Sequence, residues 1–262
     1  MERFFLFFIL NLFALILCAQ PSTLKQMDRL PIDADKFWGV DAFQRFYFSD
    51  ENVFFKVENQ KKIQFQDLQL GELESVDLLN PLEILLFYKE ANTVVILDNR
   101  LNEIDRINFN FIEDSKTVDF AGISKDDLLW VFNADLQQLE LMDYQLLDTR
   151  NSSLPLNKEI LSLKSNYNYC WLRHPDGILK FNINGSLVHQ IYMEEVLSFN
   201  IFKNQMMVQL KDELKLLDKN SDLKITFKKP EISFDQFYFN AENLYIYSDK
   251  VLYTYEFNFL NN

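Results

Sequence analysis

The chain has 262 residues, of which 48% are hydrophobic and 25% are charged. This composition predicts a protein that buries a core, and it excludes disorder as the main state. Asp and Glu number 39 against 26 Lys and Arg, for a net charge of −13, which disfavours nucleic acid as a partner. Two His and two Cys leave little material for a transition-metal site or a disulfide scaffold.

The first segment, residues 1–19, has the pattern of a signal peptide. Phe4–Leu17 is an apolar run of 14 residues that only Asn11 interrupts. It is shorter than the about 20 residues of a membrane-spanning helix and fits the hydrophobic part of an export signal. We expect cleavage after Ala19, which would leave residues 20–262 as one domain. Two alternatives are a lipoprotein acylated at Cys18 and an uncleaved anchor.

A repeat of about forty residues runs through the rest of the chain. Each copy has an apolar strand that ends near Asp or Asn, then a polar turn and an aliphatic residue; clear copies are Val94–Leu101, Leu139–Leu146, Leu179–Leu187 and Leu214–Leu223. Aligned at positions 60, 98, 143, 184 and 220, the copies lie 38, 45, 41 and 36 residues apart. A period of about 40 residues is typical of β-propeller blades.

Each repeat predicts four short strands. In the second unit the strands are expected at 74–80, 83–89, 92–97 and 103–109, with turn-forming residues between them. In the fourth unit they are expected at 159–164, 169–173, 178–181 and 187–193. The sequence therefore predicts an all-β fold: a β-propeller of about six four-stranded blades, at 37–71, 75–111, 117–155, 158–193, 196–229 and 231–260.

The sixth blade lacks a fourth strand of its own because the sequence stops at Asn262. Thr23–Leu30 reads as a strand with no local partner. A ring that stayed open would expose the edges of two sheets, so we expect Thr23–Leu30 to pair with the last blade and close the ring. A generic β-sandwich is the alternative fold, because the period drifts and no WD or kelch motif is present.

The few chemically active residues are better explained as parts of the scaffold. His174 lies in the turn sequence His-Pro-Asp-Gly, and His189 lies in a strand with alternating exposure. Cys170, between Tyr169 and Trp171, is expected to be a small core residue and not a nucleophile.

Asp218, Asn220 and Asp222 have the spacing with which a calcium loop begins. Positions six and twelve of such a loop should be Gly and Glu, but here they are Leu223 and Lys229. We therefore expect a hairpin turn, with calcium as the alternative.

The carboxylate pairs Asp126–Asp127 and Glu194–Glu195 fall at strand starts or in loops. Glycoside hydrolysis would need two carboxylates facing each other across about 5 to 9.5 Å. The sequence has no phosphate-binding loop, nucleophile elbow or zinc-protease motif. We expect no enzyme and assign no catalytic, cofactor-binding or metal-binding residue.

Two stretches, 46–55 and 234–247, are very rich in aromatic residues. In a propeller both faces of a strand are buried between blades, so we expect these aromatic side chains to belong to the core. Aromatic side chains that remain exposed at the rim of a blade would form an interaction patch.

In its blade repeat, export signal and composition, rich in Asn, Lys, Phe, Ile and Leu, the chain resembles exported β-propeller proteins of Bacteroidota. Within that group it resembles the periplasmic plug subunits of the type 9 secretion outer-membrane translocon. The resemblance implies a non-catalytic, protein-binding subunit in the periplasm or at the periplasmic face of the outer membrane. A glycan-binding or glycan-cleaving propeller and a surface lipoprotein are the alternatives.

Overall fold

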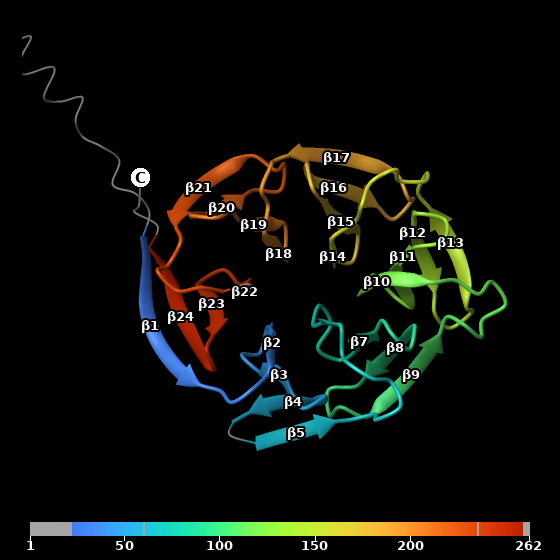
Figure 1. The fold of residues 1–262 in the computed structure, drawn as a ribbon, viewed down its shortest axis with the longest axis horizontal. Coiled ribbons are helices and arrows are strands. Elements are labelled where there is room, and N and C mark those ends of the chain that lie inside the picture. The colour runs from blue at the N-terminus through green and yellow to red at the C-terminus, as the bar shows by residue number, and fades with distance from the viewer. Residues whose placement is uncertain (1–22, 60, 235, 259–262) are drawn as a thin grey trace, which may run out of the picture.

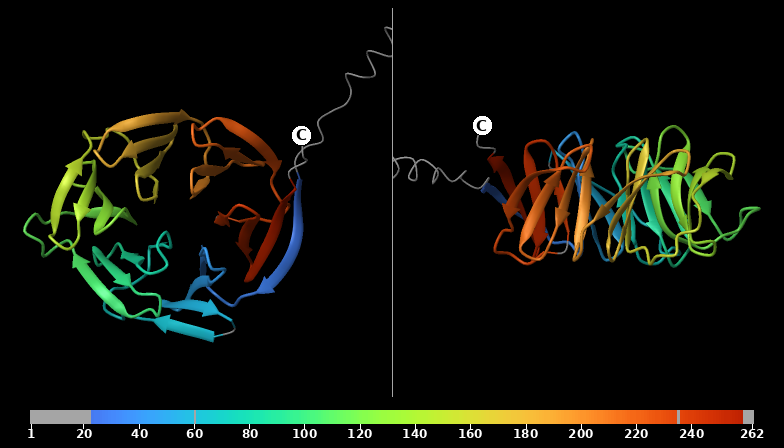
Figure 2. Two further views of the ribbon diagram at one scale, coloured as in Figure 1. Left: turned by 180° about the vertical axis from the view of Figure 1, so that it is seen from behind. Right: turned by 90° about the horizontal axis from the view of Figure 1, so that it is seen from above.

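The computed structural model describes residues 23–258 except 60 and 235. The predicted signal peptide, residues 1–19, and Cys18 lie outside this part. The described residues form six four-stranded antiparallel sheets arranged as blades around a ring, a β-propeller (Figure 1). The predicted fold class is therefore confirmed. In side view the ring is a flat disc (Figure 2).

Within each blade, the first strand lies nearest the centre of the ring and the fourth at its circumference (Figure 1). The strands of blades 1 to 3 are β2 (Lys36–Val40), β3 (Phe46–Asp50), β4 (Val53–Glu58), β5 (Lys61–Phe65), β6 (Ser75–Asp77), β7 (Ile84–Tyr88), β8 (Thr93–Leu97), β9 (Glu103–Asn108), β10 (Val118–Ile123), β11 (Leu128–Asn133), β12 (Gln138–Asp143) and β13 (Asp148–Ser152).

Blades 4 to 6 repeat this plan, except that β1 takes the fourth position of blade 6. Their strands are β14 (Ser162–Ser165), β15 (Tyr169–His174), β16 (Gly177–Asn182), β17 (Leu187–Tyr192), β18 (Ser198–Phe202), β19 (Gln205–Gln209), β20 (Glu213–Leu217), β21 (Leu223–Lys228), β22 (Phe237–Phe239), β23 (Asn243–Ser248), β24 (Val251–Asn258) and β1 (Thr23–Pro31).

The ring closes as the sequence predicted. β1 pairs antiparallel with β24, from Thr23 opposite Asn258 to Pro31 opposite Val251. The N-terminal strand thus supplies the fourth strand that the last blade lacks, and it covers the edge that β24 would otherwise expose.

The hydrophobic core is divided into six clusters, one between each pair of neighbouring blades. The second and third strands of blade 2, β7 and β8, are buried at every position because both of their faces contact a neighbouring blade. This two-sided burial explains why these strands are continuous apolar runs in the sequence. The aromatic stretches follow the same rule, since Phe48, Phe54, Phe237 and Tyr245 are buried.

The recurring Asp or Asn of the repeat begins the turn between the third and fourth strands of a blade. The side-chain oxygens of Asp98, Asn182 and Asp218 accept hydrogen bonds from the backbone N–H groups two and four residues later. The structurally equivalent positions are therefore 98, 143, 182 and 218, and the sequence alignment at 184 and 220 was displaced by two residues. These hydrogen bonds fix a turn that alternating hydrophobicity alone does not specify.

Several predicted strand ends were wrong by a few residues. The first strand of blade 2 was expected at 74–80 but spans Ser75–Asp77. Asp77 ends it, because its carboxylate accepts a hydrogen bond from the N–H of Leu79 at 2.8 Å and bends the chain. Likewise, the first strand of blade 4 was expected at 159–164 but spans Ser162–Ser165. Among the described residues, no helix has the length and hydrophobicity required to cross a membrane.

Candidate functional site

One end of the central channel contains a cavity of about 730 Å³. All six blades contribute to its lining through their first strands or the hairpins that follow them; representative residues are Trp38, Val76, Ala121, Leu163, Ile201 and Phe239. The face of the ring that bears these hairpins is called the cavity face below.

Asp77 connects three blades at the wall of this cavity. One carboxylate oxygen accepts hydrogen bonds from the N–H of Ile123 at 2.9 Å and from the Ser165 hydroxyl at 3.2 Å. Burial raises the pKa of Asp77, while these hydrogen bonds and the nearby Lys164 lower it. The inner strands approach closely here, since a Cβ on Gly122 would lie 2.6 Å from the Ser165 hydroxyl oxygen. Asp77 therefore holds blades 2, 3 and 4 together.

Lys164, the neighbour of Ser165 on β14, is a half-buried cation that lines the same cavity. Burial lowers its pKa, and the negative charge of Asp77 opposes that shift. Within the part of the chain that the structure describes, its ammonium group makes no hydrogen bond and no ion pair. The opposite charge that acts on Lys164 is therefore that of Asp77, on the same cavity wall.

A second cavity, of about 310 Å³, lies between blades 4 and 5. Tyr169 and Trp171 line it with their ring centroids 6.0 Å apart. The Lys180 ammonium lies 4.3 Å from the Tyr169 centroid and 5.3 Å from that of Trp171, in cation–π geometry. Burial lowers the pKa of Lys180. An ammonium therefore covers the aromatic surface on which a sugar ring would stack.

The two histidines are not brought together into a site. His174 is buried at the end of β15, and its Nδ1 accepts a hydrogen bond from the N–H of Asp176 at 3.2 Å. It is the turn residue that the sequence predicted. Burial, followed by the positive charge of Lys158, lowers its pKa, with Asp176 opposing. His189 is an exposed residue of β17, at the circumference of the ring.

The spacing of Asp218, Asn220 and Asp222 belongs to a hairpin turn. An Asp218 carboxylate oxygen accepts hydrogen bonds from the N–H groups of Asn220 at 2.8 Å and Asp222 at 3.1 Å. Across residues 23–258, leaving aside 60 and 235, no three His, Cys, Asp or Glu side chains are grouped so that they could hold a metal ion.

The two carboxylate pairs are exposed and lie on opposite faces of the ring. Asp126 and Asp127 belong to the hairpin that joins the first two strands of blade 3, whereas Glu194 and Glu195 belong to the connection between blades 4 and 5. The structure therefore does not bring the pairs together.

Cys170 is fully buried, among Leu172, Leu179 and Phe181. Burial raises the pKa of its thiol well above the usual value, which leaves it in the thiol form. Its environment is the core position that the sequence predicted.

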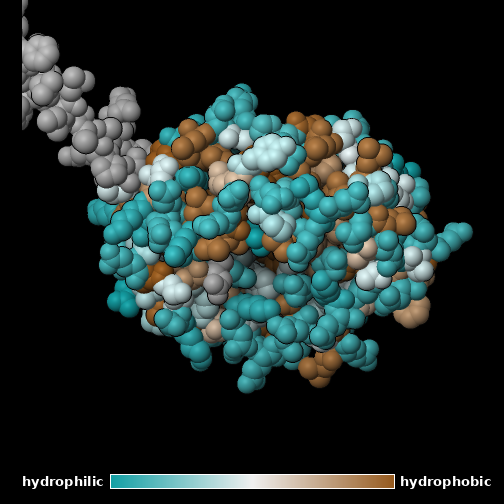
Figure 3. Space-filling model, turned by 45° about the horizontal axis from the view of Figure 1, so that its top comes forward, coloured by the Kyte–Doolittle hydropathy of each residue, from teal (hydrophilic) through white to brown (hydrophobic). Residues whose placement is uncertain are grey.

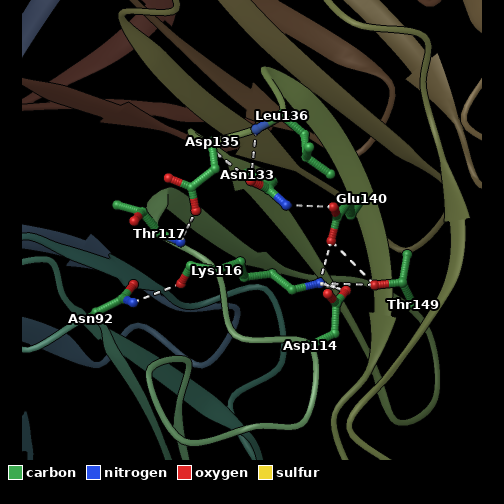
Figure 4. A network of polar contacts seen from close by, with 9 residues as sticks. All are labelled: Asn92, Asp114, Lys116, Thr117, Asn133, Asp135, Leu136, Glu140 and Thr149. Atoms are coloured by element: carbon green, nitrogen blue, oxygen red, sulfur yellow. Dashed lines mark hydrogen bonds and ion pairs between the residues drawn. The ribbon is translucent and has the colours of Figure 1, made fainter.

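A buried polar network lies away from the cavities, between blades 2 and 3 (Figure 4). The Lys116 ammonium contacts a Glu140 carboxylate oxygen at 2.7 Å and the Thr149 hydroxyl at 3.0 Å. The other Glu140 oxygen accepts a hydrogen bond from the Asn133 amide at 2.7 Å. The backbone carbonyl of Lys116 accepts one from the Asn92 amide at 2.8 Å. The network fixes the connection between two blades, and we assign it a structural role.

Sequence reasoning missed the two residues that define the main cavity, Asp77 and Lys164. Each occupies an ordinary polar position in a short strand, and their proximity depends on how blades 2 and 4 are placed around the ring. The sequence carries no local signal for such a contact.

Comparisons with known proteins support the fold and leave the function open. No protein-family model and no curated protein matches the chain. Among solved structures, the Pan2 WD40 domain of Neurospora crassa is similar with a TM-score of 0.60 and 10% identity, over 87% of this chain and 76% of that one.

Two further solved structures are similar in fold. BBS1N, solved in complex with ARL6DN, gives a TM-score of 0.63 and 11% identity over 87% of this chain and 80% of that one. Virginiamycin B lyase from Staphylococcus aureus gives a TM-score of 0.61 and 8% identity, over 89% of this chain and 99% of that one. At such identities the likeness shows the propeller fold alone.

Proposed function

We propose that the protein is an exported, non-catalytic propeller that acts as a protein-interaction subunit of the bacterial cell envelope and binds an outer-membrane protein translocon. The export signal expected at residues 1–19 and the resemblance to type 9 secretion plug subunits support the location. The structure of the cavity face supports the interaction.

One observation carries the proposal: exposed apolar side chains on three hairpins of the cavity face. Phe43, Leu82 and Tyr167 are 64%, 60% and 43% exposed, on blades 1, 2 and 4. The side of the molecule drawn in Figure 3 is a mixture of hydrophilic and hydrophobic side chains, and large apolar side chains such as Phe111 and Leu154 are exposed elsewhere as well. Large apolar and aromatic side chains that surround a depression are typical of a surface that excludes water on binding a protein.

The comparisons are compatible with this proposal. A similar propeller, BBS1N, was solved in complex with another protein. Another is a lyase, so the fold does not decide between binding and catalysis. The non-catalytic part of the proposal therefore needs its own test.

The experiment is affinity isolation from native membranes. β24 ends at Asn258 at the edge of the cavity face, since the N–H of Phe257 donates a hydrogen bond to the Glu242 carbonyl at 3.1 Å. We therefore place the tag in the exposed hairpin between β19 and β20, on the opposite face, which leaves the cavity face open. We expect mild detergent extraction to recover a large outer-membrane barrel protein in stoichiometric amount. Recovery of the propeller alone, from the soluble fraction, would contradict the proposal, as would robust turnover of generic hydrolase substrates by the purified protein.

The control is a triple variant of the exposed side chains, Phe43→Ser, Leu82→Ser and Tyr167→Ser. Because these side chains are exposed, we expect the variant to keep the wild-type thermal midpoint within a few degrees while losing the barrel protein. A folded variant that recovers the barrel protein as well as the wild type does would show that this rim is not the interface.

A further inference from the structure

The outermost strands of the six blades differ in how their free edges are protected. Each of these strands pairs with only one described strand, so its other edge faces outward at the circumference of the ring (Figure 1). Such an edge is a template for pairing with another chain, and proteins commonly block it with charged side chains. Five of the six outer strands carry exposed charged residues of this kind; examples are Lys25 on β1, Lys62 on β5, Arg106 on β9, Arg150 on β13 and Lys224 on β21.

The outer strand of blade 4, β17, is the exception. Its sequence is Leu-Val-His-Gln-Ile-Tyr, without Asp, Glu, Lys or Arg. Three of its large apolar side chains are exposed: Leu187 by 50%, Val188 by 46% and Tyr192 by 79%. The strand has one bulge, at Val188, but β9, β13 and β21 have a bulge in addition to their charges. Of the six outer strands, β17 therefore has the least protection against pairing.

The order of residues in β17 is complementary to itself. Two copies of the strand can pair antiparallel around an axis that passes between positions 189 and 190. The opposing pairs are then Leu187 with Tyr192, Val188 with Ile191 and His189 with Gln190. Apolar residues lie opposite apolar residues, and the two polar residues lie opposite each other, which is the pairing that stabilises neighbouring strands.

We propose that β17 pairs antiparallel with β17 of a second copy of this chain, which joins two four-stranded blades into one continuous sheet. In a two-fold dimer the same patch serves on both copies, as this self-complementary strand allows. Pairing satisfies the backbone groups of both free edges and covers Leu187 and Tyr192. The same arrangement of β5 would bring Lys61 and Lys62 of both copies together, whereas β17 brings no like charges together.

The contact is small, so the dimer should be weak and should depend on protein concentration. One pair of six-residue strands buries less surface than a standard protein interface and belongs with transient contacts. β17 lies at the circumference of blade 4, so pairing there leaves the cavity face accessible (Figure 1). The inference is therefore independent of the outer-membrane partner proposed above.

The first test is sedimentation velocity of the purified protein over a range of concentrations. We expect monomers at low concentration and a rising share of dimers toward about 100 μM. Val188→Lys adds the charge that the strand lacks, and Ile104→Lys is the matched control. Ile104 is 52% exposed and lies at the bulge of β9. Because a two-fold contact contains each substitution twice, Val188→Lys should weaken dimerisation about tenfold or more, and Ile104→Lys should not change it.

The second test uses cysteines to read the register. The proposed axis places position 189 of one copy opposite position 190 of the other, within reach of a disulfide. A mixture of His189→Cys and Gln190→Cys proteins should therefore form a link between positions 189 and 190 under mild oxidation, identified by peptide mass spectrometry. Neither variant alone should link to itself, because residue 189 and its counterpart in the second copy point to opposite faces of the sheet.

Three results would overturn the proposal: a wild type that stays monomeric at about 500 μM, equal weakening by Val188→Lys and Ile104→Lys, or a link from position 189 to position 189, which indicates parallel strands. Protection of the β17 amides from hydrogen exchange only in complexes isolated from membranes would also overturn it, in favour of a strand from another protein. Recovery of a barrel protein in any of these cases would leave the proposed function intact.

Discussion

Replacing Lys116 by methionine is the most informative test of the packing between blades 2 and 3. Both partners of its ion pair are almost fully buried, with side-chain exposures of 3% for Lys116 and 4% for Glu140. The Lys116→Met substitution removes the cation and leaves the Glu140 carboxylate buried, with only the Asn133 and Thr149 side chains as hydrogen-bond donors.

Breaking a buried pair in this way costs about 3–5 kcal/mol of unfolding free energy, because a buried charge is left uncompensated. For a chain of this size each kcal/mol lowers the thermal midpoint by about 2–4 °C, so we expect a decrease of roughly 6–20 °C. The double variant Lys116→Met/Glu140→Met removes both charges and should be more stable than Lys116→Met alone.

The assay is guanidinium chloride unfolding followed by tryptophan fluorescence, which includes Trp130 on the neighbouring strand β11. Lys211→Met, at an exposed position, is the control and should stay within about 0.5 kcal/mol of the wild type. A loss below about 1 kcal/mol for Lys116→Met, or a double variant less stable than the single one, would refute the reasoning.

Three further predictions concern the ring, its turns and its pH response. Deletion of residues 23–31 should expose the edge of β24 and cause unfolding or aggregation, seen by size-exclusion chromatography; retained native stability would reject the closure. Gly177→Ala should cost several kcal/mol in denaturant unfolding, since Gly177 has φ 143° and its Cβ would lie 1.9 Å from the Ile191 carbonyl oxygen; a loss under about 1 kcal/mol would contradict this. His174→Asn should reduce the loss of stability between pH 7.5 and 5.5.

The sign of the His174 effect follows from burial. Its pKa is lowered in the folded protein, so below the unfolded value of about 6.5 the unfolded chain binds more protons there than the folded one. The folded state therefore loses stability as pH falls from about 6.5 toward the lowered pKa. Asparagine keeps an acceptor for the N–H of Asp176 without titrating. Denaturant midpoints at the two pH values measure the effect, and identical pH dependence in wild type and His174→Asn would contradict it.

The fold was predictable because its signals are periodic and local. The repeated Asp or Asn at 98, 143, 182 and 218 accepts backbone hydrogen bonds that fix a turn. Each of these turns joins the third and fourth strands of its blade. The unpaired strand Thr23–Leu30 indicated ring closure, since the last repeat is one strand short.

The cavity was not predictable because its residues meet through the ring. Asp77 reaches Ile123 and Ser165 only when three inner strands converge, and Gly122 is needed for that approach without lying in a recognisable turn. Within the described residues, the Lys164 ammonium makes no hydrogen bond and no ion pair, and no sequence pattern predicts this.

The central claim is that the cavity face binds a protein of the outer membrane. The most direct measurement is quantitative mass spectrometry of complexes isolated from native membranes with the tagged wild type and the tagged triple variant Phe43→Ser, Leu82→Ser and Tyr167→Ser, at equal expression and equal thermal midpoints. The account predicts stoichiometric recovery of an outer-membrane barrel protein with the wild type and a marked decrease with the triple variant. Recovery of the wild-type propeller without any barrel protein would contradict it.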